Sequence, residues 1–194
     1  MSILHQHWKP IQCFVDLIET SLPQNGSVLE VGCFTGDTTV HYAPIVKRKN
    51  GSITLVDWFR GNAECPKGGI HGLDTFEPPT IREVLESRLG AIDAASITTI
   101  IQSDSAVAPN HIHLMGNKFN IVFIDGGHSL EVVTRDLAAF LPFVKAGGIF
   151  CGHDYNQVPV ATAVNKFVRE KNLVLEILGD PNGQLQPVWK MNIL

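Results

Sequence analysis

Two apolar stretches of the chain each end at an acidic residue with a histidine close by. Asp125 follows Phe119–Ile124 and precedes His128, whereas His153 and Asp154 directly follow a second apolar stretch. Carboxylates and imidazoles are side chains that exchange protons near neutral pH and bind divalent cations. If the fold brings the two stretches together, the sequence predicts an acid–base or metal site.

The residues between these two sites predict the elements that position them. Ile121–Ile124 is a continuous, largely β-branched run, typical of a strand covered on both faces. Residues 130–144 carry apolar side chains at helical spacing, and residues 147–152 form the second strand. Strand, helix and strand in this order form a right-handed crossover between parallel strands. Both acids are therefore expected at the carboxyl ends of parallel strands, where open α/β sheets bind ligands.

Acidic residues recur at the ends of four predicted strands. They are Glu30, Asp57, Asp104 and Asp125. A parallel sheet has no structural need for such a row, because an unpaired buried carboxylate costs free energy. The row therefore indicates a ligand with several hydroxyl and amino donors.

The turn after the first predicted strand narrows the class of ligand. Its pattern, Glu30-x-Gly32-x-x-x-Gly36, differs from the Gly-x-Gly-x-x-Gly of dinucleotide-binding turns, which argues against a nicotinamide-dependent oxidoreductase. Glycines here still let the backbone approach a ligand at a helix N-terminus. Asp57 lies 21 residues after Gly36, where an acid can accept both hydroxyls of a ribose. The turn predicts a ribose-containing ligand.

The whole chain, residues 1–194, is interpreted as a single α/β domain. Strands alternate with helices until a final hairpin, which predicts a Rossmann-like fold: a seven-stranded, mostly parallel sheet with an antiparallel last strand and helices on both faces. An N-terminal helical segment occupies residues 1–25. Residues 58–79 lack a period and are rich in glycine and proline, so they form either a loop or lid over the ligand edge or a surface insert. The predicted helices cover residues 10–22, 40–49, 81–89, 110–115, 130–144 and 158–171, and the strands cover residues 27–32, 52–57, 96–102, 121–124, 147–152, 173–178 and 186–191.

Composition and charge argue against several classes of protein. A net charge of −4 without a block of lysine and arginine argues against a nucleic-acid partner. The chain has neither a membrane-length apolar segment nor the pattern of a signal peptide, so no membrane partner is expected. The four scattered cysteines favour buried free thiols, which suits a reducing cytoplasm.

Across nearly the whole chain, these motifs resemble those of class I S-adenosylmethionine-dependent methyltransferases. The resemblance implies that Gly32–Gly36 runs alongside the methionine moiety of the cofactor and that Asp57 binds its ribose hydroxyls. It also implies that Asp104 accepts from the adenine amino group and that Asp125 lies near the transferred methyl group. The implied cofactor-binding residues are Glu30, Gly32, Cys33, Phe34, Thr35, Gly36, Asp57, Trp58, Asp104, Ser105 and Asp125.

The two stretches described first resemble a smaller group, the macrocin-type sugar O-methyltransferases. That resemblance implies that Asp125 and Asp154 hold a divalent cation such as Mg²⁺, which would lower the pKa of a substrate hydroxyl. It makes Asp125 and His128 the catalytic residues, with His128 as the base. His153 stands where the sugar enzymes have a second acid, and a hard cation prefers carboxylate to imidazole. With His153 as its third ligand, the site either binds a softer metal, or is weak, or is lost.

The implied function is methyl transfer from S-adenosylmethionine to an oxygen of a small hydroxylated acceptor. Such transfer depends mostly on positioning, because the acceptor oxygen must approach the methyl group in line. The alternative is a non-catalytic module that keeps this fold for S-adenosylmethionine binding or assembly. The segments expected to cap the pocket are short, so either the acceptor is a small molecule or a second subunit of a homo-oligomer completes the pocket.

Overall fold

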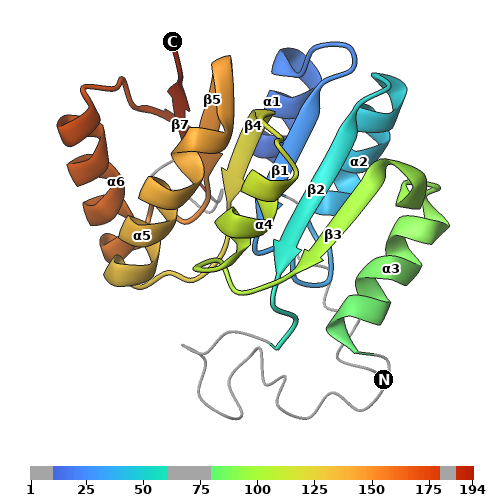
Figure 1. Cartoon of the computed structure of the whole chain (residues 1–194). Coiled ribbons are helices and arrows are strands. Elements are labelled where there is room, and N and C mark those ends of the chain that lie inside the picture. Colours follow the sequence, from blue (N-terminus) through green and yellow to red (C-terminus); the bar gives the residue numbers. More distant parts are fainter. Residues whose placement is uncertain (1–10, 61–79, 180–186) are drawn as a thin grey trace.

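The computed structural model describes residues 11–60, 80–179 and 187–194, which form a seven-stranded sheet with helices on both faces (Figure 1). The order across the sheet is β3-β2-β1-β4-β5-β7-β6. Strands β1 to β5 are parallel, and β7 runs antiparallel to both β5 and β6. The strands are β1 (Ser27–Val31), β2 (Ser52–Asp57), β3 (Thr98–Gln102), β4 (Phe119–Ile124), β5 (Val144–Gly152), β6 (Glu176–Leu178) and β7 (Val188–Asn192). The predicted fold class is confirmed.

The α-helices of the described residues divide into two layers (Figure 1). Helices α1 to α3 cover one face of the sheet, and α4 to α6 cover the other. Val28 of β1 packs into the first layer and Leu29 into the second, so both faces of the strand are buried. This two-sided burial explains the continuous apolar runs of the central strands. The helices are α1 (Gln12–Ser21), α2 (Thr39–Arg48), α3 (Ile81–Ala91), α4 (Ala108–Leu114), α5 (Leu130–Phe140) and α6 (Val158–Lys171).

Local sequence signals account for several boundaries of these elements. Thr80 caps α3 in a capping box, in which Thr80 and Glu83 each accept a backbone N–H of the other. The predicted helix 130–144 was too long, because α5 ends at Phe140 and Pro142 follows in a 3₁₀ turn, Leu141–Phe143. Strand β5 therefore begins earlier than expected, at Val144. The strand predicted at residues 173–178 is short, because only Glu176–Leu178 pair with β7.

The strand order reverses direction between β1 and β4, at the centre of the sheet. In open α/β sheets, ligands bind at the carboxyl ends of the strands at such a reversal. Asp57 and Asp125 both stand at this edge, at the end of β2 and just after β4. Residues 61–79, part of the predicted loop or lid, lie outside the described residues. Among the helices that the structure describes, none is long and apolar enough to cross a membrane.

Candidate active site

The turn between β1 and α2 depends on two glycines. Gly32 has a φ of 92°, and a Cβ added to it would lie 2.3 Å from the carbonyl oxygen of Asp125. Gly36 has a φ of 80°, and a Cβ there would lie 2.5 Å from Leu85 of α3. Both conformations favour glycine, and neither site has room for a side chain. The first glycine thus lets the β1 turn pack against the β4 turn, and the second lets it pack against α3.

Asp57 ties the β1 turn to the turn after β2. Its Oδ2 accepts the backbone N–H of Phe34 at 2.8 Å, and its Oδ1 accepts that of Phe59 at 2.7 Å. Phe34 and Phe59 have φ values of 50° and 57°, which are strained for large side chains and tend to occur at functional sites. Burial raises the pKa of Asp57, and these N–H donors oppose the rise. Each carboxylate oxygen can still accept a second hydrogen bond.

Glu30 lies in the core beside α2, and its residue is 1% exposed. Its Oε2 accepts the hydroxyl groups of Thr39 and Tyr42, each at 2.7 Å. Burial raises the pKa of Glu30 to about 7, although the two hydroxyl donors favour the charged form. The structure therefore places this predicted cofactor residue in the core, where it links β1 to the first turn of α2.

Arg88 of α3 forms hydrogen bonds with the turn between β1 and α2. Its Nη1 donates to Asp37 Oδ1 at 2.6 Å, to the Thr35 carbonyl oxygen at 3.1 Å and to the Thr35 hydroxyl at 3.3 Å. The Thr35 hydroxyl in turn donates to Asp37 Oδ2 at 2.7 Å. No local sequence pattern signals this contact, because Arg88 and the β1 turn are far apart in the chain.

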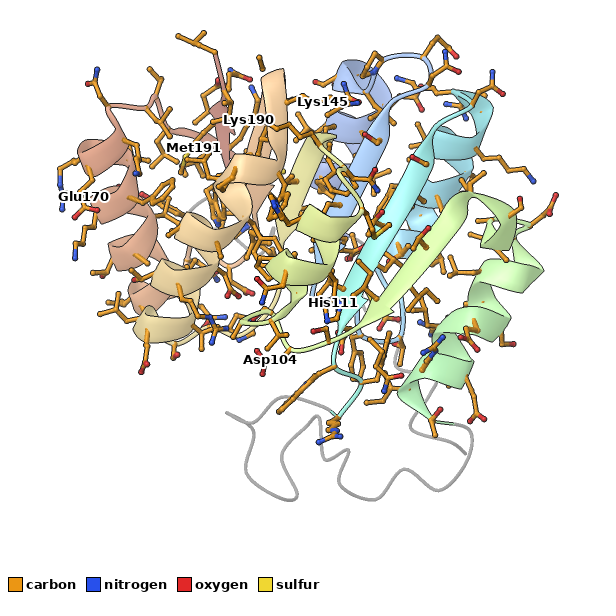
Figure 2. All side chains as sticks on the ribbon, in the orientation of Figure 1. Asp104, His111, Lys145, Glu170, Lys190 and Met191 are labelled. Atoms are coloured by element: carbon orange, nitrogen blue, oxygen red, sulfur yellow. The ribbon has the colours of Figure 1, made fainter. Side chains whose placement is uncertain are left out.

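Asp104 and Ser105 follow the carboxyl end of β3. Figure 2 shows Asp104 at the lower end of the parallel strands and Lys145, near the start of β5, at their upper end. Asp104 Oδ1 accepts the backbone N–H of Ala106 at 2.8 Å, an interaction that fixes the turn before α4. The hydroxyl of Ser105 accepts from Nη2 of Arg135 at 2.6 Å. The turn after β3 is therefore attached to α5.

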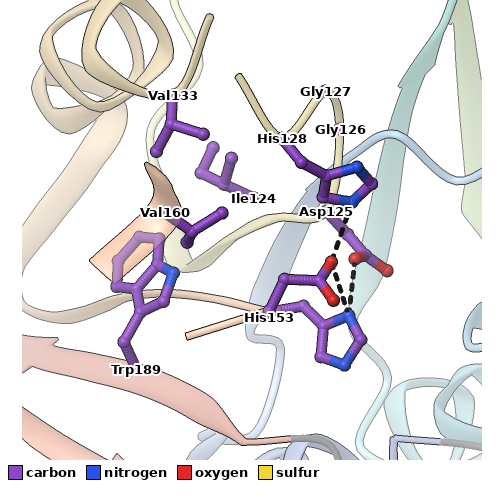
Figure 3. Close-up of a pocket in the computed structure, with 10 residues that line it drawn as sticks. Ile124, Asp125, Gly126, Gly127, His128, Val133, His153, Val160 and Trp189 are labelled. Carbon is purple, nitrogen blue, oxygen red and sulfur yellow. Dashed lines mark hydrogen bonds and ion pairs between the residues drawn. The ribbon is translucent and has the colours of Figure 1, made fainter. Parts of the chain in front are cut away.

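Four predicted residues form one cluster at the ends of β4 and β5 (Figure 3). Nδ1 of His153 lies 3.1 Å from Asp125 Oδ1 and 3.1 Å from Asp154 Oδ2. Nε2 of His128 lies 2.8 Å from Asp154 Oδ2. Asp154 has a φ of 57°, so an unusual backbone conformation aims its carboxylate at both histidines.

Electrostatic coupling shifts the pKa values within this cluster. Burial lowers the pKa of His153, but the hydrogen bonds and charges of Asp125 and Asp154 outweigh burial and raise it to about 10. Burial acts to raise the pKa of Asp154, but His128 and His153 hold it well below its usual range. For Asp125, burial dominates and raises the pKa. A protonated His153 shared by two carboxylates fits these directions.

The cluster borders a cavity with one polar and one apolar wall (Figure 3). Trp189 of β7 fills the apolar wall and packs edge-on against Phe150, with ring centroids 5.4 Å apart. A Cβ on Gly152 would lie 2.3 Å from the Trp189 ring, so glycine at that position makes room for the indole. The polar wall is lined by Asp125, His128, His153 and Asp154, and the apolar wall by Ile124, Val133, Val160 and Trp189.

Asp125, His153 and Asp154 also have the composition of a metal site. Each offers one ligand atom, and these three atoms lie within 4.8 Å of one another. Two carboxylates and an imidazole suit a transition metal better than Mg²⁺. The geometry places the ligands together, but Nδ1 of His153 cannot hold a proton and a metal at the same time.

Comparisons with known proteins agree with this architecture. A family model described as a methyltransferase domain matches residues 29–155, which is more than half of the chain. A putative rRNA-methylase from Clostridium thermocellum has a TM-score of 0.68 at 15% identity, with 96% of this chain and 97% of that chain covered. A putative caffeoyl-CoA O-methyltransferase from Staphylococcus aureus has a TM-score of 0.65 at 11% identity, with 94% and 82% covered. Precorrin-6y C5,15-methyltransferase from Geobacter metallireducens GS-15 has a TM-score of 0.63 at 13% identity, with 94% and 87% covered. At these identities, the likeness is one of fold.

Proposed function

We propose that this chain, which belongs to the methyltransferase-domain family, is an O-methyltransferase. It would transfer a methyl group from S-adenosylmethionine to an oxygen of a small hydroxylated acceptor. The observation that carries the proposal is the 2.8 Å contact between His128 Nε2 and Asp154 Oδ2. It pairs a base with a carboxylate on the turns after β4 and β5, next to the glycine turn of β1. A module that only binds the cofactor would not need such a pair.

The residues around the β1 turn suit S-adenosylmethionine. Gly32 lets the backbone approach a ligand, and Asp57 keeps lone pairs for the two ribose hydroxyls. Asp104 and Ser105 are assigned to the adenine ring, and Asp125 to the methionine end. When bound, the cofactor supplies an electrophilic methyl group on a sulfonium sulfur. The chain has to hold the acceptor oxygen in line with it and remove a proton.

His128 is the proposed general base. Because its Nε2–H faces Asp154, the basic nitrogen of the neutral ring is Nδ1. As the acceptor oxygen forms its bond to the methyl carbon, the carbon–sulfur bond breaks with its electron pair on sulfur, and the acceptor's proton passes to Nδ1. Asp154 then stabilises the imidazolium that forms.

A divalent cation is a proposed alternative partner of the same cluster. Asp125, Asp154 and His153 would hold it, and it would lower the pKa of an acceptor hydroxyl. A proton on Nδ1 of His153 would place a positive charge between the two carboxylates, each of which lies 3.1 Å from that nitrogen. We therefore propose that the metal-free form is competent and that a cation competes with the proton on His153.

The acceptor is proposed to be a small molecule with a hydroxyl group on an apolar body. Val133, Val160 and Trp189 line the same small cavity as the acids and imidazoles, so the site has an apolar side, although the cavity has room for only about one water molecule. The net charge of −4 disfavours RNA, whose phosphates need a clustered basic surface. The names of some solved structures with this fold refer to rRNA, so this part of the proposal needs a direct test.

The test is transfer of an isotope-labelled methyl group from S-adenosylmethionine to a panel of hydroxylated sugars, phenols and total RNA. The proposal predicts label on a small hydroxylated acceptor, removed by His128→Gln. Label on RNA or on nitrogen would contradict the acceptor class. Cofactor binding without transfer to any acceptor would favour the non-catalytic module.

A further inference from the structure

Leu130, the first residue of α5, is a large apolar side chain that stays 47% exposed. Its spacing places it on the buried face of the helix, because Val133, Leu137 and Phe140 follow it at the intervals of an apolar stripe. Those three side chains belong to the core between α5 and the sheet, and each is at most 3% exposed. The apolar face of α5 therefore extends one turn beyond the part that the core covers.

The position of the start of α5 explains why Leu130 is not covered. The helix follows the turn after β4, so it begins at the carboxyl edge of the sheet. The Ser129 hydroxyl accepts the N–H of Val132 at 3.3 Å and fixes the first turn there. Long side chains on a helix point back towards its N-terminus. The side chain of Leu130 is therefore directed past the sheet, towards the edge that carries the proposed base.

The cavity beside the proposed base is too small for a methyl acceptor. Val133, one helical turn from Leu130, lines it together with His128 and Asp154 (Figure 3), yet it has room for only about one water molecule. The side chain of His128 is 32% exposed, so the base reaches the surface. An acceptor that brings its hydroxyl group to His128 must keep the rest of its body outside the cavity, over the residues that surround it.

We infer that Leu130 determines acceptor specificity, by forming the surface on which an alkyl or aryl group of the acceptor lies while its hydroxyl group faces His128. Among the described residues, Leu130 is the exposed large apolar residue nearest to His128 along the chain. An apolar group placed on Leu130 removes both surfaces from water, whereas a sugar would lose hydration of its hydroxyl groups there. The inference rests on the proposed methyl transfer and adds a residue that selects the acceptor.

The test compares the dissociation constants of phenol and 4-propylphenol, measured by calorimetry on the full chain saturated with S-adenosylhomocysteine. Each added carbon that Leu130 helps to bury should tighten binding about 2- to 4-fold, so the unaltered chain should prefer 4-propylphenol by about 10- to 60-fold. Leu130→Asn makes a side chain of similar size polar, and it should reduce the preference to below about 5-fold. Leu130→Met should keep the preference, because its side chain is also apolar.

The matched control is Val174→Asn. Val174 is also apolar and is 76% exposed, but it precedes β6, which begins at the opposite edge of the sheet. This variant should keep the full preference for 4-propylphenol. In transfer of a labelled methyl group, Leu130→Asn should raise the KM for 4-propylphenol and leave kcat within about 2-fold, because the base is unaltered. An equal loss of kcat for phenol and 4-propylphenol would indicate a structural role and contradict the inference.

The inference is overturned if the unaltered chain binds 4-propylphenol no more tightly than phenol, or if Leu130→Asn and Val174→Asn show the same preference. A change of molar mass on Leu130→Asn, measured by light scattering, would instead assign Leu130 to contact with a second copy of the chain. A lower unfolding temperature would assign it to packing within the chain. Failure of the proposed function looks different, because the unaltered chain would then bind no S-adenosylhomocysteine or transfer no methyl group to any acceptor.

Discussion

His128 and Asp154 follow different strands, yet His128 Nε2 and Asp154 Oδ2 are 2.8 Å apart. The contact forms because β4 and β5 are parallel neighbours, with Ile124 paired to Gly152 at their carboxyl ends. The left-handed backbone of Asp154 then directs its carboxylate towards the imidazole. Asp154 therefore sets both the tautomer and the orientation of the proposed base.

Removing either partner of this pair should slow catalysis without weakening cofactor binding. We expect His128→Gln to lower kcat by about 10²- to 10⁴-fold, the usual contribution of a general base. Asp154→Asn should lower kcat as well, because its amide favours the wrong tautomer of His128. Steady-state kinetics measure kcat, and calorimetry measures S-adenosylhomocysteine affinity. Equal losses in affinity and kcat would assign the pair to structure instead.

Glu30 should make the stability of the protein depend on pH. Its pKa is raised from 4.5 to about 7 in the folded state, so the folded chain keeps a proton that the unfolded chain has already lost. Stability contributed by this group is present below pH 4.5 and is lost as the pH rises towards 7.

Glu30→Gln removes this titration. Relative to the unaltered chain, its free energy of unfolding should rise by up to about 3 kcal/mol between pH 4.5 and pH 8. Urea unfolding at the two pH values measures the difference. A difference that does not change with pH would show that Glu30 is not buried as described.

Arg88 should contribute to cofactor affinity although it lies outside the site. Arg88→Ala frees Thr35 and Asp37, so S-adenosylhomocysteine should bind about 10-fold more weakly. The matched control is Arg48→Ala at the C-terminal end of α2, whose exposed side chain pairs with Glu19. Equal affinities of the two variants would exclude a positioning role for Arg88.

His153 should control the choice of cation. A hard cation prefers carboxylate, so His153→Asp should bind Mg²⁺ more tightly than the unaltered chain, by about 10-fold or more. Calorimetric titration with Mg²⁺ compares the two proteins. In the unaltered chain, activity should survive a chelator, because the proposed mechanism places a protonated His153, and not a cation, between Asp125 and Asp154. Loss of all activity on chelation, restored by Mg²⁺, would contradict the proposed role of the protonated histidine.

The sequence predicted the features that follow from periodicity and strand ends. The apolar run before Asp125 and the turn at Gly32 depend on local patterns, so the sheet and the cluster at its edge could be expected. The contacts of Arg88 with the β1 turn and of Arg135 with Ser105 could not, because helices that are distant in sequence provide them. Pro142 is a local signal for the early end of α5. The apolar residues on both sides of it keep helical spacing, so the predicted helix continued to residue 144.

The pairing of His153 with two carboxylates could not be predicted from the sequence. The residue types of this cluster indicated a metal site. Whether the imidazole binds a cation or replaces one depends on which ring nitrogen faces Asp125 and Asp154. In the structure Nδ1 faces both, and burial strengthens their interaction. That geometry depends on the left-handed conformation of Asp154, which no sequence pattern indicates for an aspartate.

Calorimetric titration of the full chain with S-adenosylhomocysteine tests the central claim most directly. The account predicts one binding site per chain, with affinity lost on Asp57→Ala, because Asp57 both holds the β1 turn and is assigned to the ribose. Absence of binding at millimolar ligand would contradict the account. Binding that Asp57→Ala leaves unchanged would place the ligand elsewhere on the molecule.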